Sequence, residues 1–504
     1  MSSAIKSIMN FPLICLCLSF TVAIAESPVF DIVITGGRVM DPETNFDGIR
    51  SVGINGDRIV EISSNKLQGK RTIKASGFIV GPGFIDLHAH GQTNDAHRYQ
   101  VRDGVTTALE LESGVTFLRE WLASKTGKTI VNFGGTAPHG SLRVMAMSAY
   151  EQQAQKMQKL VEKEGLDSPK VKSLRSSETH IDFSKANYRS LSQSEITKTN
   201  QLMDNYLEAG ALGIGVPVGY YSGATAGEIF SVYQFAASRK VPIYSHTRGF
   251  GLAGIQEAIA NASASRASLH VVHANSLSLG EIQTTLSIIS DAQKNGLDIT
   301  TEVYPYSAAS TSLESQIFDE GWQKMLNISY KDLQWVATGE RLTKKTFHSY
   351  RKEGGTVIIH MMKPEWINTG VSHPITMIAS DGMPYAPAAH PRTAGTFSRV
   401  LGKYAREQQS LDLMTALKKM TIMPANRLAA TAPTMNNKGR LQVGMDADIT
   451  IFDPETVVDK ADFNGLKHSE GIEYVLINGT IVVDKGENVE NVFPGRPILG
   501  KYRR

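Results

Sequence analysis

Cysteine is almost absent from this chain. Its 504 residues include only two, Cys15 and Cys17, and both lie close to the start. Beyond residue 17 the chain can form no disulfide bond and can offer no thiolate to a metal ion. A metal site in that part of the chain must therefore be built from histidine and carboxylate side chains.

The chain also lacks an excess of either charge. Its 52 lysines and arginines balance 49 aspartates and glutamates, so the formal net charge is only +3, and no acidic or basic block stands out. This balance indicates neither a nucleic acid nor an anionic membrane surface as a partner. With 41% hydrophobic and 20% charged residues, the composition is that of a globular protein, long enough for one large domain and a smaller one.

One long apolar run stands at the start of the chain, from Phe11 to Ala23. It follows Lys6 and ends in Ala23-Ile-Ala25, which is the order of features in a secretory signal. The alternative, an uncleaved membrane anchor, is less favoured because the run is shorter than the roughly 20 residues that span a bilayer. We expect residues 1–25 to be a signal peptide, removed on export to the periplasm or the medium, which leaves no membrane attachment.

Short β-rich segments occupy both ends of the remaining chain. They are short strand-like runs at 31–35, 38–40, 51–54, 58–60, 447–452 and 475–482, and turns such as Gly36-Gly37 and Asn55-Gly56 separate them. We expect residues 26–81 and 430–504 to pair into one small β-sandwich domain.

Between these ends, apolar strands alternate with helical patterns. The expected strands are residues 79–90, 105–112, 129–135, 212–217, 241–247, 268–273, 297–304 and 375–381. Eight strands joined by helices over residues 82–429 predict an α/β fold, a (β/α)8 barrel of the TIM type. Two inserts interrupt the pattern, at about 147–190 and 307–354. Each is either a surface addition or a lid over the barrel mouth.

The first barrel strand ends in two histidines, His88 and His90. Residues two apart on a strand share a face, so both imidazoles can bind one metal ion. Asp86 lies on the same face, and we expect it to orient one of the rings from behind. By itself the pair could equally be two incidental histidines at a strand end.

Further strands end in the same kind of residue. His246, His273 and Asp381 close the fifth, sixth and eighth expected strands, and active sites of such barrels lie at these strand ends. Together with the first two histidines, the set predicts a divalent metal site, most simply one or two zinc ions. The second strand offers Glu110 and Glu112 as a bridging carboxylate. We favour Glu112 because it is nearer the rim.

Several motifs give the chain a resemblance to a known family. Pro82-Gly-Phe-Ile-Asp-Leu-His-Ala-His90 and Gly439-Arg-Leu-Gln-Val-Gly-Met-Asp-Ala-Asp-Ile-Thr-Ile-Phe452 resemble the amidohydrolase superfamily. The closer resemblance, over about residues 30–490, is to the D-aminoacylases, or N-acyl-D-amino-acid (including D-glutamate) deacylases. It rests on Gly104-Val-Thr-Thr107, His139-Gly-Ser-Leu-Arg143, Leu207-Glu-Ala-Gly-Ala-Leu-Gly213, Tyr304-Pro-Tyr306, Ser380-Asp-Gly382 and His390-Pro-Arg-Thr-Ala-Gly-Thr-Phe397.

The resemblance implies roles for individual residues. It makes His246 and His273 ligands of the tightly held metal, His88 and His90 ligands of a second metal, and Asp381 both a ligand and the general base and acid. The residues that it assigns to substrate and carbonyl are Arg392, Tyr304 and Ser310 around the α-carboxylate, and His139 beside the carbonyl. Asn275 stands where the family often has a lysine that contacts the carboxylate, and the family's strand-two cysteine falls close to Ser113, next to Glu112.

The primary hypothesis is therefore metal-dependent hydrolysis of an amide next to a carboxylate, in small N-acyl-D-amino acids. Metal-activated water would be the nucleophile, with Asp381 moving the proton. Two alternatives stay open: a metallo-dipeptidase that acts on small peptides containing a D-residue, and a periplasmic binding protein built on an inactive barrel.

Overall fold

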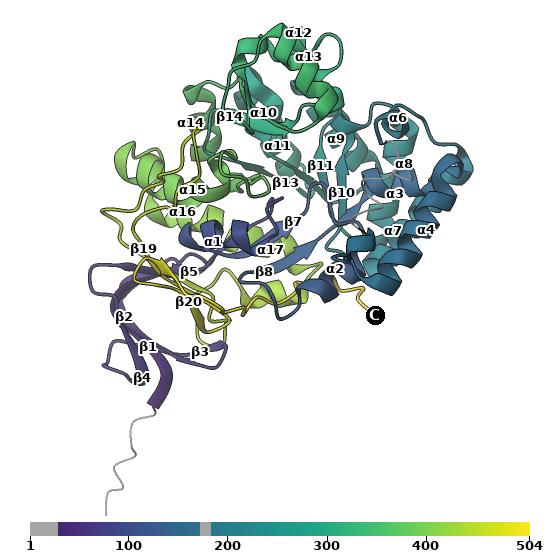
Figure 1. Ribbon diagram of the computed structural model, residues 1–504. Coiled ribbons are helices and arrows are strands. Elements are labelled where there is room, and N and C mark those ends of the chain that lie inside the picture. The colour runs from purple at the N-terminus through teal and green to yellow at the C-terminus, as the bar shows by residue number, and fades with distance from the viewer. Residues whose placement is uncertain (1–28, 172–182) are drawn as a thin grey trace, which may run out of the picture.

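The computed structural model describes residues 29–171 and 183–504, and a closed barrel of parallel strands forms its centre (Figure 1). Neighbouring strands pair in parallel, and β8 and β9 are two halves of one barrel position, since β8 pairs with β7 and β9 with β10. A parallel bridge between Ala89 and Gly382 closes the circle. The strands are β6 (Phe84–Asp86), β7 (Val105–Glu110), β8 (Asn132–Gly135), β9 (Ala137–Pro138), β10 (Ile214–Pro217), β11 (Ile243–His246), β12 (Leu269–Val271), β13 (Ile299–Val303) and β17 (Thr376–Ile378). The predicted (β/α)8 fold is confirmed.

Helices follow the strands and cover the outside of the barrel. Apolar residues of the strands, such as Val216 and Leu269, pack against Ile229, Ile255 and Ile289 of the helices. Strands buried on both faces explain the nearly continuous apolar runs in the sequence. The main helices are α1 (Asn94–Arg102), α2 (Leu118–Lys125), α3 (His139–Ala146), α7 (Gln193–Glu208), α8 (Ala226–Arg239), α9 (Leu252–Ser265), α11 (Ile282–Lys294), α14 (Pro364–Ser372), α15 (Arg392–Arg399), α16 (Leu413–Met420) and α17 (Ile422–Ala429).

A nine-stranded sheet joins the two ends of the described chain beside the barrel, purple and yellow in Figure 1. The β18 strand pairs antiparallel with β5, so C-terminal residues lie next to N-terminal ones. Buried residues from both ends, including Val52, Ile54, Ile449 and Ile451, form its core. The strands are β1 (Val29–Asp41), β2 (Phe46–Asn55), β3 (Arg58–Ser63), β4 (Gln68–Lys74), β5 (Ile79–Pro82), β18 (Ile449–Phe452), β19 (Ile472–Ile477), β20 (Thr480–Asp484) and β21 (Glu487–Asn488).

The expected strand over residues 79–90 is divided between the two sheets. Its first part is β5 of the terminal sheet, and its second part is β6 of the barrel, with Gly83 between them. A Cβ atom at Gly83 would lie only 2.2 Å from the Thr106 side chain. The close approach of the next barrel strand therefore requires a glycine where the chain passes from one sheet to the other.

The two inserts have their own secondary structure. The first contains α4 (Glu151–Glu164) and α6 (Phe183–Asn187), and its residues 172–182 lie outside the described part. The second contains a small antiparallel sheet, β14 (Ala308–Ser312), β16 (Thr356–His360) and β15 (Leu333–Trp335), with α12 (Trp322–Leu326) and α13 (Lys344–Glu353). His360, on β16, belongs to this small sheet, and its Nε2 donates a hydrogen bond to the side-chain oxygen of Gln334 at 3.0 Å.

The proposed export signal, residues 1–25, lies outside the described residues. Within residues 29–171 and 183–504, no helix is both long enough and apolar enough to cross a membrane.

Candidate active site

Two histidines and two carboxylates converge at the carboxyl end of β6. The Nε2 atoms of His88 and His90 lie 3.2 Å apart. Glu112 Oε2 lies 3.2 Å from the first of these nitrogens and 3.4 Å from the second. Asp381 Oδ1, which follows β17, lies 3.5 Å and 3.4 Å from the same two atoms. All four side chains therefore direct their polar atoms into one small space.

Glu112 connects this group to the neighbouring strand ends. Its other oxygen, Oε1, lies 3.2 Å from Nε2 of His273, whose ring is next to that of His246, with 5.0 Å between ring centroids. The structure thus contains two overlapping groups, His88–Glu112–His273 and His88–His90–Asp381, each with ligand atoms within 4.8 Å of one another. Burial lowers the pKa of His246 to about 4, so this imidazole is neutral at ordinary pH.

The chemistry of these groups fits a cation. Burial opposes a charge on His88, but the carboxylates of Asp381, Glu112 and Glu302 raise the pKa of this imidazole well above its ordinary value. The site therefore attracts positive charge, and a divalent ion satisfies the same field through nitrogen and oxygen ligands. Imidazole and carboxylate atoms at these separations, with space on one side, form the donor set of a catalytic rather than a closed structural metal site.

A second row of carboxylates holds the two histidines from behind. Glu302 Oε1 lies 2.7 Å from His88 Nδ1, and Glu110 Oε2 lies 2.7 Å from His90 Nδ1. The sequence pattern indicated Glu110 only as an alternative ligand and did not reveal Glu302. A charged residue inside the buried strand β13 is the signal that could have identified it.

Asp86 does not orient a histidine ring, contrary to the expectation from its place on the strand. Its Oδ1 accepts hydrogen bonds from the backbone N–H groups of His88 at 3.1 Å and Ser380 at 3.0 Å, and Oδ2 accepts one from the Ser380 hydroxyl. The chain bends immediately after β6, so this carboxylate reaches backbone groups. It fixes the start of the histidine pair to the segment that carries Asp381.

Backbone strain accompanies two of the site residues. His273 has a φ of 28° and Asp381 a φ of 50°, both in the left-handed region that residues other than glycine rarely adopt. His273 lies shortly after β12, and Asp381 lies shortly after β17. The unusual backbone turns the side chain toward the centre of the mouth, and such strain is typical of functional positions.

A cradle for a carboxylate lies beside Asp381. The guanidinium of Arg392 is stacked on the ring of Tyr304, 4.7 Å from its centroid, and Nη2 donates to the backbone oxygen of Ser310 at 3.3 Å. Nη1 lies 2.9 Å from Asp381 Oδ2 as an ion pair, outside hydrogen-bonding geometry. The Tyr304 hydroxyl, the Ser310 hydroxyl and Arg392 Nε and Nη1 are all buried without a hydrogen-bond partner. Four unpartnered donors grouped in this way suit a bound carboxylate.

His390 holds the arginine in this cradle. Its Nδ1 accepts a hydrogen bond from the backbone N–H of Arg392 at 3.1 Å, and its Nε2 donates to the backbone oxygen of Ala308 at 3.0 Å. Burial lowers the pKa of His390 well below its ordinary value, so the imidazole is neutral and can make both bonds. This residue, which the sequence indicated only as part of a motif, joins α15 to β14.

The structure does not bring His139 or Asn275 into the cavity. His139 is fully buried at the start of α3, and its Nδ1 lies 2.9 Å from the Tyr221 hydroxyl. The Asn275 amide donates to the backbone oxygen of Tyr304 at 3.0 Å. Each side chain thus contacts a residue near the site, Tyr221 or Tyr304, and the roles predicted for His139 and Asn275 stay predictions.

The cavity at the barrel mouth has a volume of about 400 Å³. Both inserts contribute to its wall, Asn187 from the first and Ser315 from the second. Its lining residues are His90, Glu112, Ser113, Gly140, Ser141, Asn187, Pro217, Tyr220, Tyr221, His273, Ser310, Thr311, Ser312, Ser315, Asp381, Met383 and Pro384.

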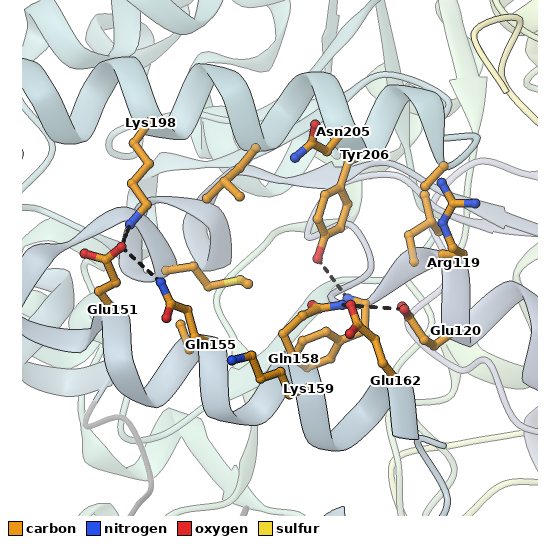
Figure 2. Close-up of a pocket in the computed structure, with 16 residues that line it drawn as sticks. Arg119, Glu120, Glu151, Gln155, Gln158, Lys159, Glu162, Lys198, Asn205 and Tyr206 are labelled. Atoms are coloured by element: carbon orange, nitrogen blue, oxygen red, sulfur yellow. Dashed lines mark hydrogen bonds and ion pairs between the residues drawn. The ribbon is translucent and has the colours of Figure 1, made fainter. Parts of the chain in front are cut away.

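A second, larger cavity of about 530 Å³ lies between α2, α4 and α7 (Figure 2). Polar groups in its wall pair with one another: Lys198 with Glu151 at 2.7 Å, while the Tyr206 hydroxyl accepts a hydrogen bond from the backbone N–H of Phe117 at 2.9 Å. None of the candidate metal ligands lines it. We therefore do not assign it to the active site.

Comparison with known proteins connects this site to a chemistry. Residues 270–483 match the model of the amidohydrolase family. An N-acyl-D-glutamate deacylase from Alcaligenes xylosoxydans xylosoxydans is 28% identical over 486 residues, 90% of this chain and 93% of the relative. A D-aminoacylase from the same organism is 28% identical over 484 residues, 91% and 95% of the two chains. The crystal structure of the N-acyl-D-glutamate deacylase of Bordetella bronchiseptica, complexed with zinc and a phosphonate inhibitor, superposes with a TM-score of 0.78 at 24% identity, over 94% of this chain and 100% of that chain.

Proposed function

We propose that this chain, an amidohydrolase similar to the D-aminoacylases in sequence and fold, is a divalent-metal hydrolase that cleaves the amide bond of N-acyl-D-amino acids. Zinc is the first candidate for the metal, because the related deacylase of Bordetella bronchiseptica binds it and the imidazole and carboxylate donors suit it. Acidic substrates such as N-acyl-D-glutamate are included in the class.

One observation carries the proposal: Asp381 touches both parts of the site. Its Oδ1 faces the two imidazoles of His88 and His90, and its Oδ2 faces the guanidinium of Arg392. A substrate whose carboxylate lies on Arg392 has its neighbouring amide within reach of the metal-binding group. This is the geometry required by an amide one atom away from a carboxylate, as in an N-acyl amino acid.

Each of the site residues has a separate role in hydrolysis. When bound, a divalent ion supplies a Lewis acid that makes water ionisable near neutral pH and polarises a carbonyl. Asp381 takes a proton from the attacking water and returns it to the departing nitrogen. Arg392, with the Tyr304 and Ser310 hydroxyls, fixes the carboxylate and so aligns the amide carbon with the water. The buried setting strengthens each of these interactions.

No specific observation favours the dipeptidase alternative. A free amino group on the acyl side would need a carboxylate of its own. Among the described residues that line the cavity, the only acids are Glu112 and Asp381, and both belong to the candidate metal groups. A binding protein, the other alternative, would not need a general base such as Asp381 between the candidate metal ligands and Arg392.

The first experiment measures metal content and amide hydrolysis on the same purified protein. We expect bound divalent metal, and release of free amino acid from N-acetyl-D-amino acids that is at least about 100-fold faster than from their L-enantiomers. Asp381→Asn should lower kcat by about 100-fold or more, because general acid–base catalysis contributes this much, while the far-UV circular dichroism stays unchanged. Normal turnover by this variant, or hydrolysis of the L series alone, would refute the proposal.

We further propose that the enzyme works outside the cytoplasm, in the periplasm or the medium. This rests on the sequence of residues 1–25 alone. N-terminal sequencing of protein recovered from the exported fraction, with a new terminus near residue 26, would support it, and an intact Met1 in the cytosolic fraction would oppose it.

A further inference from the structure

We propose that Glu302, linked to His270, is a positioning residue that fixes the tautomer and orientation of His88 for metal binding. This inference rests on the proposed function, since it presupposes a metal at the His88 group. Nothing in the sequence motifs or in the chain's similarity to other proteins assigns a role to Glu302 or His270.

The proposal starts from an unbroken line of hydrogen bonds that runs from the barrel interior to the site. The hydroxyl of Thr300 lies 2.7 Å from His270 Nδ1, and His270 Nε2 lies 3.1 Å from Glu302 Oε2. The other oxygen of Glu302, Oε1, lies 2.7 Å from His88 Nδ1. Residues on β12, on β13 and just after β6 thus join one carboxylate to two imidazoles.

With Glu302 ionised and both rings neutral, as metal binding requires of His88, only one arrangement of protons satisfies the whole line. An ionised Glu302 can only accept, so His88 donates from Nδ1 and His270 donates from Nε2. A neutral His270 then has an unprotonated Nδ1, which accepts the proton of the Thr300 hydroxyl. Burial lowers the pKa of His270, which keeps this ring neutral.

This arrangement decides what His88 presents to the site. With its proton on Nδ1, the ring directs the Nε2 lone pair toward Glu112 and Asp381, where a metal ligand is required. The opposite tautomer would direct an N–H into the same space and prevent coordination. Glu302 therefore acts through His88 and does not touch the metal or the substrate.

The burial of this carboxylate also argues for a role beyond stability. The Glu302 side chain is 1% exposed, as is that of His88, and His270 is fully buried. A buried carboxylate with two imidazoles is costly to desolvate, and an apolar residue in a barrel strand generally stabilises a fold at least as well. A charged group at this position is explained by what it does to His88.

The experiment compares Glu302→Gln with Glu228→Gln in the full-length mature protein. Glu228 is a control of matched burial: its side chain is 2% exposed and pairs with Arg143 at 2.7 Å, away from the histidines of the metal groups. Zinc affinity is measured by competition with a chromophoric chelator. We expect Glu302→Gln to weaken zinc binding by about 10- to 100-fold, the usual effect of losing such a partner, and Glu228→Gln to leave it within about threefold of wild type.

Cobalt supplies a second readout that a merely structural role would not change. The d–d absorption of the cobalt-loaded protein reports ligand geometry, and it should shift in Glu302→Gln and stay the same in Glu228→Gln. If Glu302→Gln does not fold, His270→Leu tests the same line, because it removes the donor to Glu302 Oε2 and should weaken zinc binding about threefold or more.

The outcomes separate this inference from the proposed function. Wild-type zinc affinity and an unchanged cobalt spectrum in Glu302→Gln overturn the positioning role while deacylation by the wild type still supports the proposed function. Weakened zinc binding in Glu302→Gln supports the positioning role even if no N-acyl amino acid is hydrolysed, a result that would refute only the proposed function. A wild-type protein that binds no divalent metal overturns both.

Discussion

Arg392 shows how much a single residue in this site depends on its surroundings. Its guanidinium is 1% exposed, stacked on Tyr304 and paired with Asp381, and two of its nitrogens have no hydrogen-bond partner. A buried cation with unused donors is costly unless an anion completes its coordination. These donors suit the carboxylate of a substrate, which is the role proposed above for this residue.

Replacing the Arg392 guanidinium with the ammonium group of a lysine tests whether Arg392 binds a carboxylate. Arg392→Lys keeps the charge beside Asp381 and loses the two-pronged hydrogen bonding, which a carboxylate needs. We expect KM for N-acetyl-D-amino acids to rise about 10-fold or more, corresponding to about 1.4 kcal/mol of lost binding, with kcat within about threefold of wild type. The matching N-acetyl-D-amino acid amides, which lack the carboxylate, are the control, and their KM should change little. A fall in kcat alone would contradict a carboxylate-binding role.

Among the elements, α7 connects the first insert to the barrel. It begins with a capping box, in which Glu195 accepts hydrogen bonds from the backbone N–H of Ser192 at 2.9 Å and the Ser192 hydroxyl at 3.0 Å. The other carboxylate oxygen accepts from the backbone N–H of Ser148 at 2.8 Å and from Arg189 at 2.7 Å. One side chain thus starts a helix and holds both edges of the insert that borders the cavity.

The same carboxylate makes the stability of this element depend on pH. Burial opposes its charge, but the hydrogen bonds from Ser192, Ser148 and Arg189 outweigh it and lower the pKa of Glu195 to about 2. Because the folded pKa is lower than the ordinary value, the stabilisation is complete above about pH 5 and is lost as the pH falls toward 2. We expect Glu195→Gln to melt at a lower temperature than wild type at neutral pH, with the gap narrowing from about pH 5 to about pH 3. A gap that does not depend on pH would contradict this account.

At the scale of the whole molecule, a buried polar network joins the barrel to the sheet built from the chain ends. Asp448 Oδ2 accepts hydrogen bonds from Lys438 at 2.6 Å and from Asn132 of β8 at 2.9 Å. Its Oδ1 accepts from the backbone N–H of Asn478 at 2.7 Å, and the Asn478 amide in turn donates to Asn132 at 2.8 Å. The two parts of the fold are therefore held by specific bonds as well as by apolar packing.

Removing the charge at the centre of this network should destabilise the protein without changing the site. Asp448→Asn leaves Lys438 buried with Asp446 as its remaining partner, so we expect a loss of about 3 kcal/mol in the free energy of unfolding, near the lower end of the cost of breaking a buried ion pair. Urea titration measures it, and zinc affinity should stay at the wild-type value. Asp57→Asn, which removes an exposed partner of Arg496, is the control and should cost less than about 1 kcal/mol. Equal losses in the two variants would show that burial of the network contributes nothing.

Much of the fold, and the location of the chemistry, follow from local patterns in the sequence. Eight apolar runs separated by helical patterns predict a parallel barrel, and the polar residues that follow those runs must meet at one end of it. This is why His88, His90, His246, His273 and Asp381 could be grouped by their positions in the chain alone. Glu112 could be preferred over Glu110 for the same reason: it lies closer to the rim, and in the structure it faces the histidines while Glu110 stands behind His90.

The partners of individual side chains could not be obtained in this way. Asp86 binds the backbone of Ser380, 294 residues away, His139 faces Tyr221 inside the wall, and Asn275 supports the backbone of Tyr304. Each of these contacts depends on how a strand or helix is rotated against its neighbours. A period of two residues along one strand fixes the face of a side chain but not which residue of another strand lies opposite.

The sequence by itself determined the barrel, the convergence of metal-binding residue types at its mouth, and the similarity to amide hydrolases, because strand periodicity and strand ends are local properties. Only the tertiary structure decided that Glu302 and Glu110 hold the two histidines from behind, that Arg392 pairs with Asp381, and that His139 and Asn275 lie in supporting positions. These arrangements join residues far apart in the chain, and their energies come from burial and hydrogen-bond geometry, which exist only once the barrel has closed.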